Sequence, residues 1–138
     1  MQVEDFNPSQ PVAVLDIHSV DDPRALYEGG EGPPFPGTQE TISHAGVLDG
    51  LYEWVEANDC DGPDVTEVST VASSDDEQVD RIVWQGCGVP VEHLRIAGSG
   101  HGWPGVSVGF VVQRLLGPPT ELINASDEVW AFASQFER

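Results

Sequence analysis

The chain has 138 residues, enough for one domain with its own hydrophobic core, and 39% hydrophobic residues with four Trp exclude a wholly disordered chain. Its 24 acidic residues, five Arg and no Lys give a formal net charge of −19, which repels phosphate backbones and anionic membrane surfaces. We therefore expect no nucleic acid and no membrane as partner, and we interpret the acidic residues as a solvated coat.

No segment of the sequence predicts membrane insertion or export. The longest apolar run, around 106–116, is interrupted by Gly109, Gln113 and Arg114 and cannot span a bilayer. No charged segment followed by an apolar stretch opens the chain, so we expect no secretory signal in it. The compartment stays open on these grounds, because a mature secreted form would look the same.

The first half of the chain predicts a strand, a long loop and a helix. Residues 1–10 are polar and predict a flexible arm, and the apolar run 11–17 predicts a strand. A loop rich in Gly and Pro follows, and Thr38 then offers an N-cap for a helix over 38–59. The apolar residues of this helix recur at steps of three and four: Ile42, Ala45, Leu48, Leu51, Tyr52 and Val55.

The second half predicts a group of strands and then helices. The segment DCDGPD (59–64) lacks the glycine position and the closing Glu of a calcium loop, so it predicts a turn. Three strands follow, over 65–71, 79–85 and 91–97. FVVQRLLG indicates a short helix, and the chain closes with an amphipathic helix capped by Asn124 or Ser126. The fold class expected is α/β, with a sheet of about four strands flanked by helices.

Cys60 and Cys87 allow one disulfide, which would close a loop of nearly thirty residues. In an oxidising compartment such a bridge stabilises the fold, whereas in the cytosol both residues would be free buried thiols. Two cysteines alone do not decide between these states.

Residues suited to acid–base chemistry follow two of the predicted strands. The first strand runs into His-Ser-Val-Asp-Asp and the last into Gly-Ser-Gly-His-Gly. The carboxyl ends of strands in an α/β sheet gather reactive groups, and an acid followed by a histidine is the second half of the order Ser…Asp…His. We expect His101 to act as the base and Asp22 to orient it, with Asp21 and Asp16 as alternative acids. The other histidines are expected to be structural: His18, His44 and His93.

The segments VAVLDIHSVDDPRALYEGG and VEHLRIAGSGHGWPG resemble the polyhydroxybutyrate depolymerase and feruloyl esterase family of α/β-hydrolases. The family reads His-Gly-x-x-Asp-x-x-x-x-Tyr, with which His18, Asp22 and Tyr27 are in register, and Gly-Gly-Gly-His-x-Trp-Pro-Gly, which places His101 at its histidine. LGPPTELINASDEVWAFASQF resembles the closing helix of the family. The resemblance covers nearly all of this chain but only about the C-terminal half of a family catalytic domain.

The resemblance implies a truncated α/β-hydrolase-like domain over 1–138 that needs no metal and no organic cofactor. It also implies small acyl, feruloyl-type or polyhydroxyalkanoate esters as substrates. The contexts of Cys60 and Cys87 match a cysteine pair of secreted family members, which suggests a secreted or periplasmic protein. Ser19 departs from the family, which has Gly there, and the family's nucleophile elbow and oxyanion-hole loop belong to the half that this sequence does not match.

A replacement nucleophile is suggested by Gly-Val-Ser107-Val-Gly, which satisfies G-x-S-x-G six residues after His101. A helix is predicted after it, as an elbow requires, but a Gly-Pro loop precedes it instead of a strand. Ser99 is closer to His101 along the chain, but on an extended loop the two side chains would point the same way without bonding. Trp103 on the same loop is expected to be a packing residue.

We therefore predict a serine ester hydrolase with Ser107 as nucleophile, His101 as general base and Asp22 as the orienting acid. The alternative is a non-catalytic C-terminal fragment or an acidic binding module on a relic hydrolase scaffold. Half a hydrolase sheet would leave an edge and a core face uncovered, so we also expect a homodimer.

Overall fold

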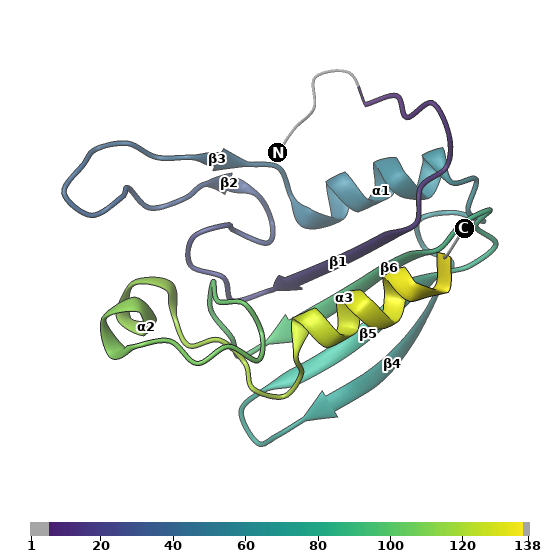
Figure 1. The fold of residues 1–138 in the computed structure, drawn as a ribbon. Helices are drawn as coiled ribbons and strands as arrows, with labels where there is room; N and C mark the ends of the chain where they lie inside the picture. The colour runs from purple at the N-terminus through teal and green to yellow at the C-terminus, as the bar shows by residue number, and fades with distance from the viewer. Residues whose placement is uncertain (1–5, 137–138) are drawn as a thin grey trace.

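The structure, a computed structural model, describes residues 6–136. Its centre is a mixed four-stranded sheet in the order β1-β6-β5-β4 (Figure 1). The strands are β1 (Val14–Ser19), β4 (Thr66–Ser73), β5 (Gln78–Trp84) and β6 (Val91–Ala97). Strands β1 and β6 are parallel, whereas β6 with β5 and β5 with β4 are antiparallel. The four strands expected from the sequence are therefore present.

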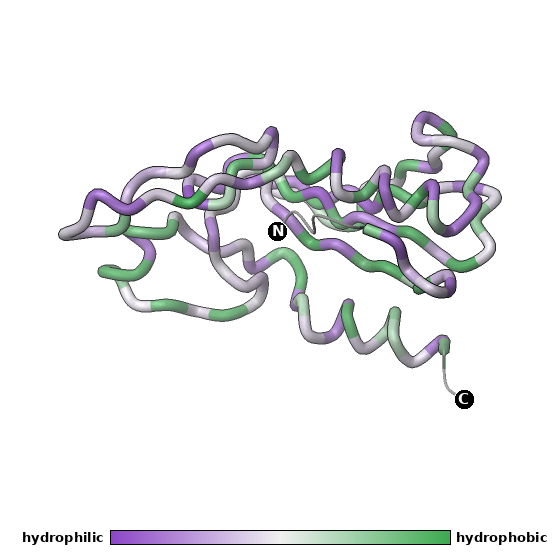
Figure 2. The backbone as a smooth tube through the Cα atoms, turned by 90° about the horizontal axis from the view of Figure 1, so that it is seen from above, coloured by the Kyte–Doolittle hydropathy of each residue, from purple (hydrophilic) through white to green (hydrophobic). Residues whose placement is uncertain are grey.

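Helices lie on both faces of this sheet. The helices are α1 (Val47–Ala57), α2 (Phe110–Leu116) and α3 (Ala125–Ala133), and a 3-10 turn, η1 (Ser134–Phe136), follows α3. Figures 1 and 2 show α1 and α3 on opposite faces, with α2 and the β2–β3 loop projecting beyond one end of the sheet. Among residues 6–136, no helix combines the length and apolar character needed to cross a membrane.

Alternation along the strands divides the hydrophobic core in two, because successive side chains of a strand point to opposite faces. The core under α1 consists of Leu51, Val55, Ile82, Trp84 and Val91. The core on the opposite face consists of Val79, Leu94, Ile96 and Ile123. Strand β1 and the central strands β5 and β6 thus pack on both faces of the sheet, whereas β4 is mostly exposed.

The first helix is shorter than the sequence predicts. It begins at Val47 after the N-cap Gly46, not at Thr38. Residues Ser43–His44 instead form β3, which pairs with β2 (Gly30–Glu31). Thr38 does act as a cap, but of a tight turn: its hydroxyl donates to the Phe35 carbonyl and accepts the Glu40 N–H. The prediction failed because capping residues serve turns and helices alike.

The N-terminal ends of β1 and β6 are held by Asn58 and a disulfide. The fully buried amide of Asn58 donates to the Val12 carbonyl at 2.8 Å and accepts the Val12 N–H at 3.1 Å. Cys60 and Cys87, at a sequence separation of 27, form a disulfide. In the loop-entropy model, closing this loop stabilises the folded state by about 3–4 kcal/mol. Residues 59–64 form the expected turn.

The two ends of the chain differ from expectation in opposite ways. Of the predicted flexible arm, residues 1–5 lie outside the described residues, but Phe6 packs edge-on against Trp54 with ring centroids 4.7 Å apart. Asn124 caps α3 by accepting the N–H groups of Ser126 and Asp127. The apolar face predicted for α3 is only partly covered, because Phe132 is buried whereas Trp130 is 71% exposed.

Candidate functional site

Two loops leave the same end of the sheet because β1 and β6 run parallel, with Ser19 opposite Ile96 in the register. The loop after β1 carries Asp22, and the loop after β6 carries His101. The Val20 N–H donates to the Ile96 carbonyl at 2.8 Å and extends the pairing beyond the strand. The topology therefore brings together two residues that lie 79 positions apart in the sequence.

Asp22 and His101 form a hydrogen-bonded acid–histidine pair. The Nδ1 atom of His101 lies 2.7 Å from Oδ2 of Asp22, whose side chain is buried, while the imidazole is about half exposed. The other carboxylate oxygen, Oδ1, accepts the backbone N–H groups of Arg24 at 2.7 Å and Ala25 at 2.9 Å. Because the carboxylate can only accept, it holds the proton on Nδ1 and leaves Nε2 as the basic nitrogen.

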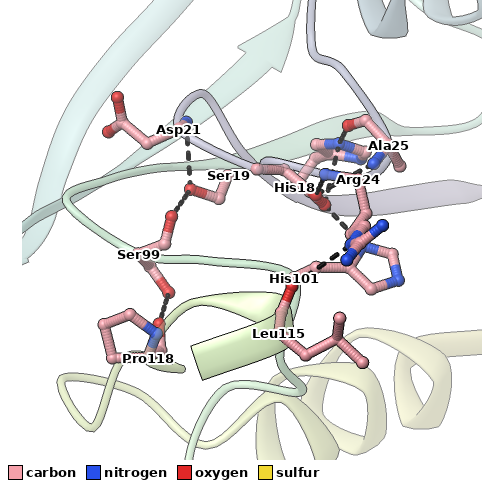
Figure 3. Close-up of polar contacts among 10 residues, drawn as sticks. His18, Ser19, Asp21, Arg24, Ala25, Ser99, His101, Leu115 and Pro118 are labelled. Carbon is pink, nitrogen blue, oxygen red and sulfur yellow. Dashed lines mark hydrogen bonds and ion pairs between the residues drawn. The ribbon is translucent and has the colours of Figure 1, made fainter. Parts of the chain in front are cut away.

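His18 supports the turn that holds Asp22. Its Nε2 atom lies 2.8 Å from the Ala25 carbonyl and 3.7 Å from Oδ2 of Asp22. A carbonyl only accepts, so Nε2 of His18 carries the proton and donates to it. Figure 3 shows His18, Arg24 and Ala25 gathered beside the ring of His101. The sequence predicts a structural role for His18, and its hydrogen bond to the Ala25 carbonyl stabilises the turn.

Neighbouring polar residues join the two loops instead of taking part in the pair. Ser19 Oγ donates to the Ser99 carbonyl at 2.6 Å, and Asp21 Oδ2 accepts the Gly98 N–H at 2.7 Å. Ser99 is buried, and its hydroxyl donates to the Pro118 carbonyl at 3.2 Å (Figure 3). Asp21 is thus occupied by the backbone of the histidine loop, and the Ser99 hydroxyl is bonded away from His101.

The glycines of the histidine loop are required by close backbone approaches. A Cβ atom at Gly100 would lie 2.3 Å from the Leu116 carbonyl oxygen, and Gly98 has a φ of +86°. The close approach allows two backbone hydrogen bonds. The Gly100 N–H donates to the Pro118 carbonyl at 2.7 Å, and the His101 N–H donates to the Leu116 carbonyl at 2.6 Å. The loop between α2 and α3 therefore fixes the backbone that presents His101.

Ser107 lies on an exposed loop just before α2. Within residues 6–136, no hydrogen bond joins its hydroxyl to His101, so the structure links two of the three predicted residues by a hydrogen bond, and Ser107 is not bonded to either of them. Trp103 is 53% exposed and donates through Nε1 to Ser126 at the start of α3. It therefore packs less completely than the sequence predicts.

A second acid–histidine contact is buried under the long loop. Asp16 Oδ2 lies 2.8 Å from Nδ1 of the fully buried His93, and Nε2 of His93 lies 3.0 Å from the Tyr27 hydroxyl. Burial raises the pKa of Tyr27 above its ordinary value. Sequence reasoning missed this cluster, although β1 and β6 side by side make Asp16 a direct neighbour of His93. Asp16 is therefore engaged away from His101.

Two cavities border His101. One has a volume of about 220 Å³ and lies between Asp22, His101 and Trp103, and the other has a volume of about 160 Å³ and is walled mainly by apolar side chains of the long loop and α2. In the part of the chain that the structure describes, no three His, Cys, Asp or Glu side chains are grouped so as to hold a metal ion. The arrangement can accept a proton at Nε2 of His101 beside two cavities of small-molecule size.

The chain matches no protein-family model, no curated protein and no solved structure. Two features bear on function: the geometry of the site and the motif resemblance.

Proposed function

We propose that the protein is a carboxylic ester hydrolase in which His101 is the general base, Asp22 orients it and Ser107 is the nucleophile. The observation that carries the proposal is the 2.7 Å contact between Nδ1 of His101 and the buried Asp22 carboxylate. A carboxylate in this position fixes the tautomer and stabilises the imidazolium that forms when Nε2 takes a proton. His93 differs from His101 because its ring is fully buried and its Nε2 lies 3.0 Å from the Tyr27 hydroxyl, so neither of its nitrogens is exposed to a substrate.

The reaction would begin with attack of Ser107 Oγ on the ester carbonyl while its proton passes to Nε2 of His101. The alcohol leaves with that proton, and water then cleaves the acyl-enzyme by the same route. Two features support Ser107: it is exposed, and α2 begins three residues after it. Its loop must move towards His101 for the first step, and Gly109, whose Cβ position has no neighbour within 4 Å, leaves space for that movement.

The purified full chain should hydrolyse p-nitrophenyl acetate and butyrate. Both His101→Ala and Ser107→Ala should lose at least about 10²-fold in kcat/KM, the size of effect expected for removing a base or a nucleophile. Ser69→Ala is the matched control, because Ser69 is exposed on β4 far from the pair. An inactive wild type would favour the alternative, a non-catalytic binding module on a hydrolase-like scaffold.

Full activity in Ser107→Ala together with loss in His101→Ala would leave the base in place and remove Ser107 as the nucleophile. A serine-directed phosphonate followed by mass spectrometry of the peptides would then locate the reacting residue. Covalent labelling at Ser107 in the wild type is the expected result.

We also propose that two copies associate through the side formed by α3 and β1. Among the described residues, β1 has an unpaired edge, and exposed apolar side chains of α3 and η1 lie beside it: Val129, Trp130 and Phe136. A cavity of about 450 Å³ separates this part of α3 from Val12 and Leu15. Sedimentation velocity should show a dimer at micromolar concentration that Trp130→Glu dissociates and Val68→Glu, on the exposed face of β4, does not. A monomer at all concentrations would contradict it.

A further inference from the structure

The cavity of about 160 Å³ beside His101 has more apolar walls than the other cavity that borders His101. Eight of the eleven residues around it are apolar or glycine, and the six that form the apolar walls are Pro33, Phe35, Pro36, Ile42, Leu115 and Leu116. Phe35 and Ile42 are 48% and 49% exposed, so their side chains are not covered by the rest of the described chain. Apolar surface left open beside a reactive group is typical of a ligand pocket.

The two walls of the cavity are fixed relative to each other by Arg24. Its Nε donates to the Leu115 carbonyl at 3.2 Å on the α2 side, and its Nη1 donates to the Pro34 carbonyl at 3.2 Å on the opposite side. Backbone bonds from Gly32 to Ile42 and from Phe35 to Glu40 close the hairpin that carries the second wall. The cavity is therefore formed before any ligand arrives, which lowers the entropic cost of binding.

The same contacts argue against an anionic ligand, and the apolar walls disfavour a charge of either sign because a charged group there would lose its hydration. The guanidinium of Arg24 is directed to backbone carbonyls, and the molecule as a whole carries a net charge of −19, which disfavours an anion. An apolar protein cavity of about 150 Å³ is large enough to bind benzene. The size and walls of this cavity therefore suit an uncharged group of about six carbons.

We infer that this cavity is the binding pocket for one uncharged apolar arm of the substrate, about the size of a benzene ring or a hexyl chain. The inference rests on the proposed ester hydrolysis, because His101 borders both this cavity and the one that contains Asp22. An ester bound with its carbonyl at Nε2 of His101 places one arm in the apolar cavity and leaves the other towards Trp103. Ile42 and Phe35 at the cavity determine the size of the arm that is accepted.

The arm can belong to the acyl or to the alcohol part of the ester, and two substrate series separate these sources. The first series, ethyl esters from acetate to octanoate, varies the acyl chain. The second series, acetates from ethyl to octyl together with benzyl acetate, varies the alcohol. Hydrolysis is followed by pH-stat in both. In the series whose varied arm binds in the cavity, kcat/KM should rise about fourfold for each added methylene, because each added CH₂ is buried. The rise should level off near six carbons. A flat response in both series would overturn the inference.

Ile42→Trp should fill the cavity and lower the hexyl-to-ethyl selectivity of the responding series at least about tenfold. Val111→Trp is the matched control, because Val111 is 78% exposed on α2 and does not border the cavity. Phe35→Ala should move the plateau to longer chains. Unchanged selectivity in Ile42→Trp would overturn the assignment of the pocket.

A binding measurement separates this inference from the proposed activity. Benzyl alcohol titrated into the wild type should bind saturably in ligand-observed NMR, in Val111→Trp as well, and not in Ile42→Trp. If no ester is hydrolysed but this pattern is found, the pocket stands and the esterase proposal fails. If esters are hydrolysed but benzyl alcohol does not bind, or binds equally to Ile42→Trp, the pocket inference fails alone.

Discussion

Both oxygens of the Asp22 carboxylate accept hydrogen bonds, one from its own turn and the other from His101. Oδ1 accepts two backbone N–H groups of its own turn, and Oδ2 accepts Nδ1 of His101. The first pair of contacts is local and follows from an Asp at a tight turn, whereas the second needs two loops to meet. A single substitution can therefore separate the structural role of this residue from its effect on the histidine.

Asp22→Asn should keep the turn, because an amide oxygen can still accept the two N–H groups, but remove the negative charge beside His101. We expect kcat/KM for p-nitrophenyl acetate to fall about 10³- to 10⁴-fold with little change in the free energy of unfolding. Asp21→Asn is the control, since its carboxylate bonds the Gly98 N–H and not the imidazole. Equal losses in the two variants would mean that Asp22 is not the orienting acid.

Asp80 is a buried carboxylate on β5 whose charge is compensated. The Arg95 guanidinium, at 2.9 Å, lowers the pKa of Asp80, and the Thr70 hydroxyl and Gln78 amide assist, while burial opposes them. A carboxyl with a lowered folded-state pKa stabilises the fold above its unfolded pKa of about 4, and this stabilisation is lost as the pH falls through the folded value.

Asp80→Asn should therefore lower the free energy of unfolding by about 1.5–3 kcal/mol at pH 7, the range for a hydrogen bond to a charged group. The difference from wild type should shrink as the pH falls from about 4 through the lowered folded-state pKa of Asp80, because the wild-type carboxyl becomes protonated over that range as well. Urea unfolding at several pH values measures both quantities. A difference that is constant from pH 7 to pH 3 would show that ionisation of Asp80 contributes nothing.

At the level of elements, sequence patterns predicted the strands well and the start of the first helix poorly. The 79–85 and 91–97 segments alternate between two faces that both pack, so local pattern and tertiary structure agree, whereas the 65–71 segment forms a mostly exposed edge strand. Ile42 fits the helical pattern, yet it lies in the hairpin with β2 and β3 because pairing with a distant segment overrides local propensity. The separation of Ser107 from His101 depends on how the loop before α2 sits, which no local pattern determines.

Gly100→Ala tests whether the glycine-rich loop holds His101 in place. The new Cβ would lie 2.3 Å from the Leu116 carbonyl oxygen, so the histidine loop must shift away from the C-terminal end of α2. We expect ester hydrolysis to fall at least about tenfold and the free energy of unfolding to fall by about 1–3 kcal/mol.

The control for this loop is Gly50→Ala in α1, where a Cβ has no neighbour within 4 Å. That substitution should stabilise the protein by about 0.5–1 kcal/mol, because Ala favours helix over Gly, and leave hydrolysis unchanged. Full activity of Gly100→Ala would show that the loop tolerates the displacement.

At the level of the whole molecule, the net charge of −19 opposes folding by self-repulsion. Raising NaCl from 20 mM to 1 M should increase Tm by about 5 °C, with KCl equally effective, because the Debye length falls to about 3 Å. Glu56→Gln removes a like charge three residues from Glu53, in the last turn of α1 where the dipole is also unfavourable, and should raise Tm at low salt more than at high salt. A Tm independent of salt would contradict this account.

The disulfide and Asn58 fasten the end of the sheet that is remote from His101, and this gives the molecule unequal resistance to local opening. Hydrogen exchange should find amides around 58–60 and 88–91 open only with global unfolding, whereas those of 105–116 exchange through low-energy fluctuations. Reduction of the disulfide should erase much of this gradient. A scaffold clamped at one end lets the loop that carries Ser107 rearrange while the core stays closed, so substrate-dependent motion need not cost global stability.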